Sequence, residues 1–461
     1  MNNKEISSLL KPFLKSETIS TDTAINQATT NLQLADTDSI CFYHITDADN
    51  AETLFLERLK STKCRNLIVS KSVEIENANI WVIDHMNFLK AQEIVANLIY
   101  PNNNTLKIAG ITGTNGKTTV SFLAMQMATL LNEPSISIGT IGVRSLEKNL
   151  ENDILSTTPS YLELRKIIHR FQDDYKYIFM EVSSHALAQS RLHKVELDCA
   201  AWTSFSQDHL DYHKDYSDYF NAKLKILESS VSKDLIIPSS EIDLKRELID
   251  SGASLDLVEP IYDEEIDIGF RASYNQANLG VAKRLVEKIT SKSVDKSILK
   301  KLTLPSGRFE SISFDEHIVI VDYAHTPDAL ENICGTIKKD FSEYDLRVVF
   351  GCGGDRDRMK RPLMGSAVSR FADSIFVTSD NPRSEDPKSI IDDILPGITT
   401  DYKRDEDRRI AIHLSLSDLK RKTVILIAGK GHEEYQDVKG KKCHFSDREE
   451  VLKFIDGKKN V

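Results

Sequence analysis

One loop constrains the fold of this chain more than any other feature. Residues 112–119, TGTNGKTT, join an apolar run at 106–111 to a helix-like run at 120–131. Glycines let the backbone turn tightly and point its N–H groups at phosphate, and a helix that begins there adds a partial positive charge. In such a loop Lys117 reaches the β- and γ-phosphates of a nucleotide, and the Thr118 hydroxyl binds Mg²⁺. The order strand, loop and helix predicts a nucleotide-binding parallel sheet and disfavours an ordinary glycine-rich turn.

The loop departs from the commonest spacing of this motif. That spacing places a glycine six residues before the lysine, where this chain has Ile111, and Gly110 and Gly113 lie on either side of that position. The loop is therefore a variant of the common phosphate-binding motif, and this restricts the protein families that the chain can resemble.

Length and composition indicate a soluble protein of several domains. The 461 residues suit about three domains at roughly 100–200 residues each. A net charge of −11 argues against a broad nucleic-acid surface, although one cleft can still be basic. The six cysteines form no Cys-x-x-Cys pair, which is typical of reduced cytoplasmic thiols. No signal peptide is evident and no apolar run approaches the roughly 20 residues that span a bilayer, so we expect a cytoplasmic protein.

Apolar runs divide the chain into three α/β regions. The first hundred residues hold short runs at 66–70 and 80–84, and the polar stretch at 101–105 suits a linker. Strand-like runs then alternate with helix-length segments, which is typical of a doubly wound parallel sheet. These runs lie at 106–111, 135–141, 177–182, 199–205 and 234–238.

A second boundary falls at residues 302–307, where proline and glycine interrupt the pattern after a helical segment at 275–288. Beyond it a new alternating series indicates another nucleotide-fold-like α/β domain. Its strand-like runs lie at 318–322, 346–350, 374–378 and 423–428.

Ten further motifs follow the loop in a fixed order, and together the set resembles the Mur ligases, the ATP-dependent amide ligases of peptidoglycan precursor synthesis. They are TTP (157–159), MEVSSHALAQSR (180–191), DHLDYH (208–213), NAK (221–223), YNQAN (274–278), SGRFE (306–310), DYAHTPDAL (322–330), GCGGDRDRMKRP (351–362), SDNPRSEDP (379–387) and GKGHEEYQ (429–436). The motifs span about three-quarters of the chain.

The resemblance implies an α/β fold with the three-domain Mur ligase architecture. A small N-terminal α/β domain (1–104) is expected to bind the UDP part of the substrate. A central P-loop parallel-sheet domain (105–302) is expected to bind ATP. A C-terminal Rossmann-like domain (303–461) is expected to bind the incoming amino acid.

The motifs are most similar to those of the branch that adds the third amino acid. Within that branch, Asp-Asn-Pro-Arg marks use of meso-2,6-diaminopimelate rather than L-lysine, and residues 380–383 have this sequence. The resemblance therefore implies ATP-dependent addition of meso-diaminopimelate to UDP-N-acetylmuramoyl-L-alanyl-D-glutamate through an acyl phosphate. The protein is expected to act as a monomer without nucleic-acid partners.

The ATP site implied by the resemblance draws on both larger domains. Asn278 is expected to meet adenine, although a helix-face amide is the alternative, and Arg308 and Asp322 are expected to close on the nucleotide. The remaining contacts come from the loop, namely Gly113, Thr114, Asn115, Gly116, Lys117, Thr118 and Thr119.

Two Mg²⁺ ions are implied, held by Thr118, Glu181, His209 and a carbamate that CO₂ forms on Lys223. Glu181 ends a buried-looking strand near the loop, where a carboxylate suits Mg²⁺, and a solvated strand-end acid is the alternative. A structural role is the alternative for His209. Lys225 competes with Lys223 for the carbamate assignment, and Lys117, Lys223 and His209 are the expected catalytic residues.

Two further sets of residues are implied to bind the substrates. The muramoyl-peptide set is Thr157, Thr158, Ser183, Gln189 and Arg191. The diaminopimelate set is Arg361, Asp380, Asn381, Pro382, Arg383, Gly429 and Glu433. Guanidinium groups suit the carboxylates of such a ligand, and a glutamate suits an ammonium. Arg361 lies in a charge run whose members are usually solvated, and Arg356 and Arg358 are assigned to the surface.

The N-terminal region departs most from the family. The family's Asp-Ser-Arg type motif is missing and Thr29-Thr30-Asn31 stands in a comparable place, so Thr30 is a candidate contact for UDP. Residues 203–205 read Thr-Ser-Phe where Thr-Asn-Leu is often found.

Three rival interpretations remain open at this stage. A folylpolyglutamate synthetase-like ligase shares the loop and the carbamylated lysine, but TTP and DNPR argue against it. A degenerate binding protein would be expected to lose Lys117, Glu181 or His209, and all three are present. A motor-like NTPase would need no pocket for an amino acid.

Overall fold

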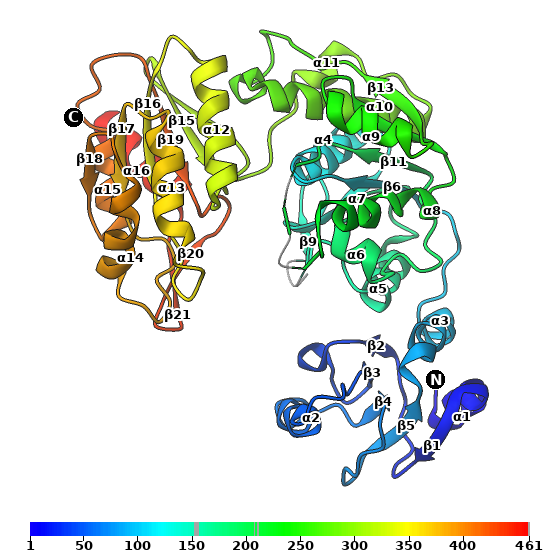
Figure 1. Ribbon diagram of the computed structural model, residues 1–461. Helices are drawn as coiled ribbons and strands as arrows, with labels where there is room; N and C mark the ends of the chain where they lie inside the picture. Colours follow the sequence, from blue (N-terminus) through cyan, green and yellow to red (C-terminus); the bar gives the residue numbers. More distant parts are fainter. Residues whose placement is uncertain (152–155, 207, 210–211, 460–461) are drawn as a thin grey trace. The chain divides into compact units, whose positions relative to one another are not determined.

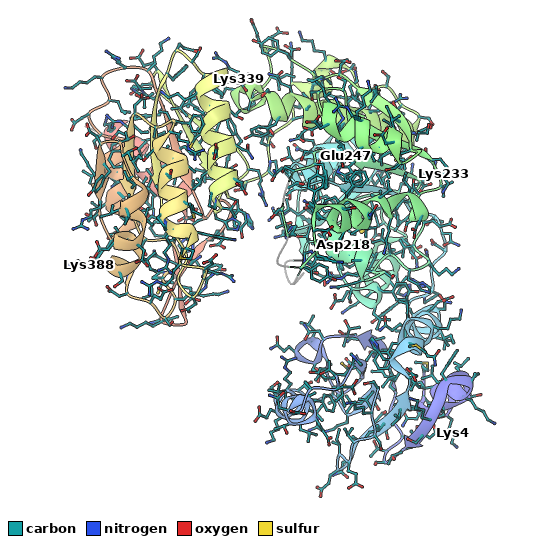
Figure 2. All side chains as sticks on the ribbon, in the orientation of Figure 1. Lys4, Asp218, Lys233, Glu247, Lys339 and Lys388 are labelled. Atoms are coloured by element: carbon teal, nitrogen blue, oxygen red, sulfur yellow. The ribbon has the colours of Figure 1, made fainter. Side chains whose placement is uncertain are left out.

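The computed structural model describes residues 1–151, 156–206, 208–209 and 212–459 (Figure 1). The chain forms two compact units. The first unit comprises Met1–Ile237, Glu241–Leu257 and Lys283–Val294, and the second comprises Pro238–Ser240, Val258–Ala282 and Asp295–Val461. Charged side chains such as Lys4, Lys233, Lys339 and Lys388 are exposed and point away from the ribbon (Figure 2).

The first unit begins with a five-stranded sheet of order β1-β5-β4-β3-β2. Strands β2 to β5 are parallel, and β1 runs antiparallel to β5 at the edge. The strands are β1 (Leu14–Thr18), β2 (Gln27–Thr29), β3 (Ser39–Tyr43), β4 (Asn66–Val69) and β5 (Asn79–Ile83). Trp81 and Phe42 are buried on one face of this sheet, and Leu67 belongs to a separate apolar cluster. The sequence predicted β4 and β5 within one residue of these bounds.

Helices cover both faces of this sheet. The capping box at Asn2 and Glu5 begins the first helix, since the Asn2 side chain accepts the Glu5 N–H and Glu5 accepts the Asn2 N–H. The helical segments are α1 (Asn3–Leu10), η1 (Lys11–Phe13), η2 (Leu32–Leu34), α2 (Ala51–Lys60), η3 (His85–Asn87) and α3 (Phe88–Ile99).

An eight-stranded sheet follows, of order β13-β12-β11-β6-β10-β7-β8-β9. The five strands from β12 to β7 are parallel, which confirms the predicted doubly wound pattern, and β8 and β9 add an antiparallel edge. The strands are β6 (Lys107–Thr112), β7 (Ser135–Gly139), β8 (Gly142–Arg144), β9 (Asn149–Glu151), β10 (Tyr177–Glu181), β11 (Cys199–Trp202), β12 (Asp234–Pro238) and β13 (Ser254–Val258).

Two of these strands are shorter than the sequence predicted. The apolar run that begins at Ser135 stops pairing at Gly139, because the chain turns back there into β8. The run that begins at Cys199 leaves the sheet after Trp202, because the next residues hydrogen-bond to the phosphate loop.

Helices surround this sheet, and α4 begins directly at the phosphate loop. They are α4 (Lys117–Leu130), α5 (Tyr161–Phe171), α6 (Ser184–Ala188), α7 (Tyr216–Leu224), α8 (Ile226–Ser229) and α9 (Ile242–Asp250). Next comes α10 (Ser273–Thr290), whose N-terminal part belongs to the second unit. The sequence predicted most of α10 from its helical periodicity.

The second unit contains a six-stranded sheet of order β14-β15-β19-β16-β17-β18. Only the β14–β15 pair is antiparallel. The strands are β14 (Glu310–Phe314), β15 (His317–Asp322), β16 (Asp345–Phe350), β17 (Ser374–Val377), β18 (Tyr402–Arg404) and β19 (Thr423–Ala428). A hairpin of β20 (Tyr435–Val438) and β21 (Lys441–His444) forms a small separate sheet.

Helices lie on both faces of the six-stranded sheet, as expected for a Rossmann-like domain. Alternate strand residues such as Val348 and Val349 belong to two different apolar clusters. One cluster includes residues of α12 (Pro327–Asp340), α13 (Lys360–Ser369) and α14 (Pro387–Ile394), and the other includes residues of α15 (Arg408–Ser415) and α16 (Asp447–Lys459). Short segments complete the unit, namely η4 (Ile268–Arg271), α11 (Lys296–Leu299) and η5 (Leu395–Gly397).

A buried ion pair fixes the carboxyl edge of this sheet. The Arg408 Nε donates to Asp447 Oδ1 over 2.7 Å, and both side chains are fully buried. The Arg408 Nη2 also donates to the Ala428 carbonyl oxygen at the end of β19, over 2.9 Å. Such a pair holds the last residue of the strand in place, because breaking it would leave a buried charge unpaired.

In the part of the chain that the structure describes, no helix is long and apolar enough to cross a membrane.

Candidate active site

The phosphate loop leaves β6 and enters α4 with two glycines in unusual backbone conformations. Gly116 caps the helix at φ +86°, and Gly113 has φ +149°. The Lys117 Nζ folds back onto the loop and donates to the carbonyl oxygens of Gly113 and Thr114, both over 2.8 Å. Lys117 is therefore held against the loop by two of the loop's own carbonyl oxygens. The N-terminus of α4 begins at this lysine, and its partial positive charge favours an anionic phosphate.

A second segment clamps this loop from the neighbouring strand. The Thr203 hydroxyl donates to the Asn115 carbonyl oxygen over 2.5 Å, and the Ser204 hydroxyl accepts the Asn115 N–H over 3.0 Å. The Thr114 N–H donates to the Ser204 carbonyl oxygen over 2.9 Å. Residues 203–205 depart from the family sequence, and the hydroxyls of Thr203 and Ser204 hold the loop.

We expect Gly113→Ala to weaken nucleotide binding at least tenfold. A Cβ on Gly113 would lie 2.0 Å from the Thr203 hydroxyl oxygen, so the clamp would have to move. Gly252→Ala is the matched control, since Gly252 also has positive φ (+77°) but nothing lies within 4 Å of its Cβ position. Titration with a fluorescent ATP analogue measures the effect, and equal losses in the two variants would contradict it.

Lys223 lies on α7 directly beneath the loop. Its side chain is only 1% exposed, and its Nζ donates to the Gly113 carbonyl oxygen over 2.9 Å. Burial, assisted by the nearby charge of Lys117, lowers the pKa of the Lys223 amine well below its usual value. Lys225 is exposed, so the geometry favours Lys223 as the lysine with special chemistry. A neutral amine is the form that reacts with CO₂.

Tyr219 lies close to the phosphate loop, Lys223 and His209, although it was not among the site residues predicted from the sequence. Its hydroxyl lies 3.2 Å from the Thr114 hydroxyl, and the Lys223 Nζ lies 4.7 Å from the centre of its ring. The His209 ring centre is 6.0 Å from that of Tyr219. The helical spacing of Tyr219 and Lys223, four residues apart, places them on one face of α7.

Glu181 ends β10, next to β6 in the sheet. Its carboxylate is 1% exposed and accepts the Thr140 N–H over 2.9 Å. The Thr140 hydroxyl lies 3.1 Å from that of Thr157. A Cβ on Gly139 would lie 1.9 Å from Glu181 Oε1, so this glycine makes room for the carboxylate. Glu181 is therefore a held and buried group, not a solvated strand-end acid.

The five residues assigned to the muramoyl-peptide substrate lie in connected hydrogen bonds. The Thr158 hydroxyl accepts the Ser183 N–H over 2.9 Å. The Arg191 Nη1 donates to the Thr158 carbonyl oxygen over 2.6 Å, and Arg191 Nη2 donates to Gln189 Oε1 over 2.8 Å. Burial lowers the pKa of the Arg191 guanidinium. Thr157 reaches the group through Thr140, so the structure brings the whole set together.

His209 belongs to a cluster of imidazole rings in the first unit. Its ring centre lies 5.0 Å from that of His185, and the His185 ring lies 5.7 Å from that of His213. His213 is buried between Ser184 and Asp218. The His209 side chain is 43% exposed, against 2% for that of His213, and His209 has φ +54°. Leu210 and Asp211 of the same motif lie outside the described residues.

In the second unit, Arg308 and Asp322 approach each other around Tyr323. The Arg308 guanidinium lies 4.9 Å from the centre of the Tyr323 ring. Asp322 accepts the Phe309 N–H and the Ala324 N–H, both over 2.8 Å, and burial raises the pKa of its carboxyl. Asn278 lies on α10 and its amide donates to Asn275 over 3.4 Å.

The Asp-Asn-Pro-Arg segment follows β17 and meets the motif that follows β19. The Asn381 amide nitrogen donates to Glu433 over 2.8 Å, and the Lys430 Nζ donates to both Asn381 and Glu433 over 3.2 and 3.1 Å. Burial raises the pKa of the Asp380 carboxyl, while Arg408 and Lys430 oppose that rise. Lys430 is fully buried. It was not among the residues predicted from the sequence, although it lies between the predicted residues Gly429 and Glu433.

Arg361, predicted to bind diaminopimelate, is buried and is not a solvated member of its charge run. Its side chain is 1% exposed, and its two terminal nitrogens donate to Glu385 and Asp393 over 2.7 to 2.9 Å. These two carboxylates hold the guanidinium in one orientation. Arg356, assigned to the surface, is exposed, and its Cγ and the Arg383 Nη1 both lie near Gly353. Arg358 is exposed as expected and pairs with Asp393.

The carboxyl edge of the N-terminal parallel strands also carries polar groups. Thr30 directly follows β2, beside Asn31, whose N–H donates to the Thr29 hydroxyl over 3.0 Å. His44 follows β3 and stacks on His85, which follows β5, with ring centres 3.6 Å apart. Ligands of parallel sheets bind at this edge. The candidate Thr30 therefore lies where such a site is expected.

Family models match two regions of the chain. The model described as the Mur ligase middle domain matches residues 111–281. The model described as the Mur ligase, glutamate ligase domain matches residues 307–431. The first region holds the phosphate loop, Glu181 and Lys223, and the second holds Arg308, Asp322 and the Asp-Asn-Pro-Arg segment.

Curated relatives match most of the chain. The UDP-N-acetylmuramoyl-L-alanyl-D-glutamate--2,6-diaminopimelate ligase of Clostridium tetani is 36% identical over 435 residues, which are 87% of this chain and 89% of that protein. The ligase of the same name from Aquifex aeolicus is 38% identical over 381 residues, or 76% of this chain and 78% of that protein.

Solved structures extend the comparison. A structure of a UDP-N-acetylmuramoyl-L-alanyl-D-glutamate--2,6-diaminopimelate ligase superposes with a TM-score of 0.60 at 27% identity, covering 95% of this chain and 96% of that one. Folylpolyglutamate synthase of Mycobacterium tuberculosis gives a TM-score of 0.54 at 18% identity, covering 75% of this chain and 90% of that one. The second likeness shows the fold alone.

Proposed function

This chain belongs to the Mur ligase family of ATP-dependent amide ligases, and we propose that it adds meso-2,6-diaminopimelate to UDP-N-acetylmuramoyl-L-alanyl-D-glutamate. The observation that carries the proposal is the Asp-Asn-Pro-Arg segment, which is held at the carboxyl edge of the second sheet by Lys430 and Glu433. The relatives that name this substrate pair match 87% and 76% of the chain, and the family model of residues 307–431 spans the segment. We also propose that the reaction takes place in the cytoplasm and that the protein acts as a monomer.

We propose three functional domains within the two compact units. Residues 1–104 would bind the UDP group, with Thr30 as one contact, and residues 105–302 would bind ATP and the muramoyl peptide. Residues 303–461 would bind diaminopimelate. The separate five-, eight- and six-stranded sheets, each with helices packed on it, support this division.

The residues present fit two Mg²⁺ ions and a carbamate. Glu181 offers a buried carboxylate, Thr118 a hydroxyl at the helix start, and His209 a partly exposed imidazole. Lys223 offers a buried amine of lowered pKa, which is the form able to take up CO₂ and become an anionic ligand. When bound, Mg²⁺ would neutralise charge on the transferring phosphate. No cluster of three or more His, Cys, Asp or Glu side chains that could hold a metal occurs among the described residues.

The chain's own groups suit phosphoryl transfer. The N–H groups of the loop and Lys117 would hold the β- and γ-phosphates, which positions the γ-phosphoryl group for attack by the D-glutamyl side-chain carboxylate. Arg191, held by Gln189 and Thr158, would fix the substrate next to the loop. Arg308 and Asp322 would contact the nucleotide, and Asn278 would contact adenine. The product of this step is an acyl phosphate and ADP.

The second step joins the amino acid. The amine of diaminopimelate attacks the acyl phosphate, a tetrahedral intermediate forms, and phosphate leaves to give the amide. Arg383 would bind the distal carboxylate that lysine lacks, and Glu433 would bind an ammonium group. Arg361 would support these contacts through its ion pair with Glu385. The exposed Arg356, which lies beside Gly353, is a second guanidinium that could bind a carboxylate of the amino acid.

We expect phosphate release from ATP and Mg²⁺ only when both the UDP-muramoyl dipeptide and meso-diaminopimelate are present. The assay compares meso-diaminopimelate with L-lysine, and it includes dihydropteroate plus glutamate as the folate-ligase control. Phosphate release with L-lysine alone would support ligase activity but contradict the role of Asp-Asn-Pro-Arg in selecting diaminopimelate. Release with the folate pair, or without any acceptor, would contradict the proposed function.

A further inference from the structure

Two loops meet at the carboxyl edge of the second sheet. One follows β16 and covers residues 351–359, and the other follows β17 and covers residues 378–386. Because β16 and β17 are neighbouring parallel strands, the loops emerge side by side. The Gly354 N–H donates to the Asn381 carbonyl oxygen over 2.9 Å, so the loops touch at their bases.

One ion pair joins the first loop to the second through the start of α13. Arg361 donates from Nη2 to Glu385 Oε1 over 2.7 Å and from Nη1 to Glu385 Oε2 over 2.9 Å. This bidentate arrangement fixes both position and orientation of the carboxylate. Arg361 is 1% exposed and Glu385 is 23% exposed, so solvent screens the pair only in part.

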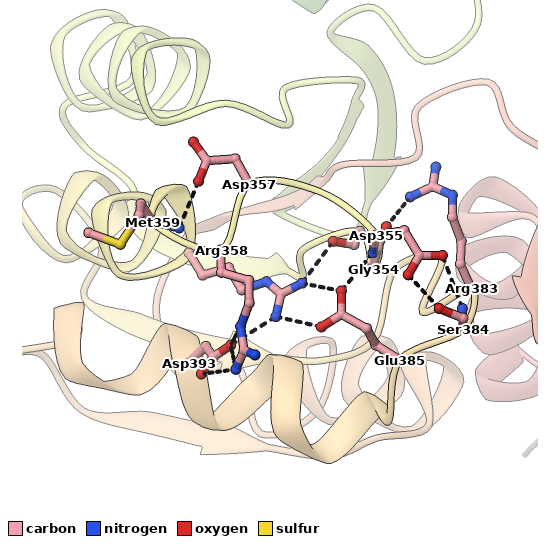
Figure 3. A network of polar contacts seen from close by, with 11 residues as sticks. Gly354, Asp355, Asp357, Arg358, Met359, Arg383, Ser384, Glu385 and Asp393 are labelled. Atoms are coloured by element: carbon pink, nitrogen blue, oxygen red, sulfur yellow. Dashed lines mark hydrogen bonds and ion pairs between the residues drawn. The ribbon is translucent and has the colours of Figure 1, made fainter. Parts of the chain in front are cut away.

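Glu385 also holds the tip of the first loop directly. Its Oε1 accepts the Asp355 N–H over 2.6 Å, and the Asp355 carboxylate accepts the Ser384 hydroxyl over 2.5 Å. Asp355 has φ +55°, a left-handed conformation that costs energy for a residue with a side chain. The network compensates for that conformation, and Figure 3 shows the two carboxylates bridging the loops.

Arg383 lies at the end of this chain of contacts. Its backbone N–H donates to the Asp437 carbonyl oxygen over 2.9 Å, and its own carbonyl oxygen accepts the Lys439 N–H over 2.7 Å. Its Nη1 donates to the Gly354 carbonyl oxygen over 2.6 Å. The direction of the Arg383 guanidinium is therefore set by the first loop, which Glu385 and Arg361 hold.

We propose that Glu385 is a positioning residue for amino-acid selectivity: by binding Arg361 and the Asp355 N–H, it holds the first loop so that Gly354 orients the Arg383 guanidinium. This inference rests on the proposed function, in which Arg383 recognises the distal carboxylate of diaminopimelate.

The charge of Glu385 persists over the pH range in which the enzyme would be assayed. The Arg361 guanidinium lowers the pKa of the Glu385 carboxyl to about 2. A glutamine at this position keeps the shape and one acceptor but loses the charge and presents an N–H₂ group to Arg361. Glu385→Gln is therefore the smallest change that removes the pair.

We expect Glu385→Gln to raise the KM for meso-diaminopimelate about tenfold while kcat and the KM for ATP stay within about twofold, since a misplaced recognition group mainly weakens ground-state binding. The ratio of diaminopimelate to lysine turnover should fall by the same factor. Asp392→Asn is the matched control, because Asp392 is a carboxylate of α14 that pairs with an arginine, Arg404, over 2.7 Å, and both side chains are about half exposed.

Hydrogen exchange gives a readout that does not depend on activity. Peptides covering residues 351–359 and 379–386 should exchange faster in Glu385→Gln, while those covering β19 should not change. Unaltered exchange and unaltered selectivity in a folded variant would overturn the inference, as would an equal shift of KM in Asp392→Asn. If the wild type releases no diaminopimelate-dependent phosphate, the proposed function fails, and the exchange data alone then decide whether Glu385 positions the loop.

Discussion

Replacement of Lys223 with methionine lowers ligase activity about 10³-fold and leaves the fold at least as stable. The loss follows because no other described side chain beneath the loop can become a carbamate. Lys225, the nearest lysine along the chain, is exposed. Phosphate release under saturating substrates measures the activity, and thermal unfolding measures the stability.

The stability part of this prediction comes from burial. An amine that is 1% exposed costs free energy when it is charged, and methionine replaces it with an apolar chain of similar length. The Gly113 carbonyl oxygen keeps a partner, because Lys117 also donates to it over 2.8 Å. The lowered pKa of Lys223 means that the unfolded chain binds the extra proton, so wild-type stability rises with pH up to the usual value of 10.5 and the methionine variant lacks that rise.

Lys225→Met is the control for Lys223→Met, since it removes the same charge from the same helix at an exposed position. We expect it to retain activity within about twofold. Bicarbonate at high concentration should not restore the Lys223 variant, because there is no amine to carbamylate. Full activity of Lys223→Met, or restoration by bicarbonate, would rule out the carbamate.

The order of motifs along the chain was enough to predict the class of fold. Strands of parallel sheets are continuous apolar runs, and β6, β10, β12, β16 and β19 were each predicted within one residue of their observed bounds. The short edge strands were not predicted. β9 and β18 have three residues each, and their pairing depends on neighbours that local pattern does not reveal.

Site residues could be predicted from the sequence only where the residues that form the site lie close together along the chain. The phosphate loop and Glu181 at the end of β10 follow from strand, turn and helix signals. The burial of Arg361 does not, because a run of charged residues is usually solvated, and its partners Glu385 and Asp393 lie 24 and 32 residues away. The clamp by Thr203 and Ser204 likewise depends on how β11 lies next to β6.

Replacement of Arg383 with asparagine should raise the KM for meso-diaminopimelate by about 10² to 10³-fold and leave nucleotide binding unchanged. Asparagine is chosen because Arg383 has φ +51°, a left-handed conformation that asparagine tolerates better than alanine does. The variant therefore removes the guanidinium with little change to the backbone bonds to Asp437 and Lys439.

Lysine is the informative second substrate, since it has the same spacing between its two amino groups as diaminopimelate but no distal carboxylate. Its turnover should be unchanged or higher in Arg383→Asn, so the preference for diaminopimelate falls by two orders of magnitude or more. Arg370→Gln is the matched control, because Arg370 is an exposed arginine of the same unit that pairs with Glu331, away from the loops that hold Arg383. Initial rates with both amino acids and a nucleotide titration measure the three quantities.

The combination of results distinguishes recognition from general damage. A fold that is disturbed at this edge would lose lysine and diaminopimelate turnover together, whereas loss of one guanidinium affects only the substrate with the extra carboxylate. If nucleotide binding fell as far as diaminopimelate addition, or if the addition survived, Arg383 would not be the selectivity residue. In that case Arg356, which lies beside Gly353 and is exposed, would become the group to replace next.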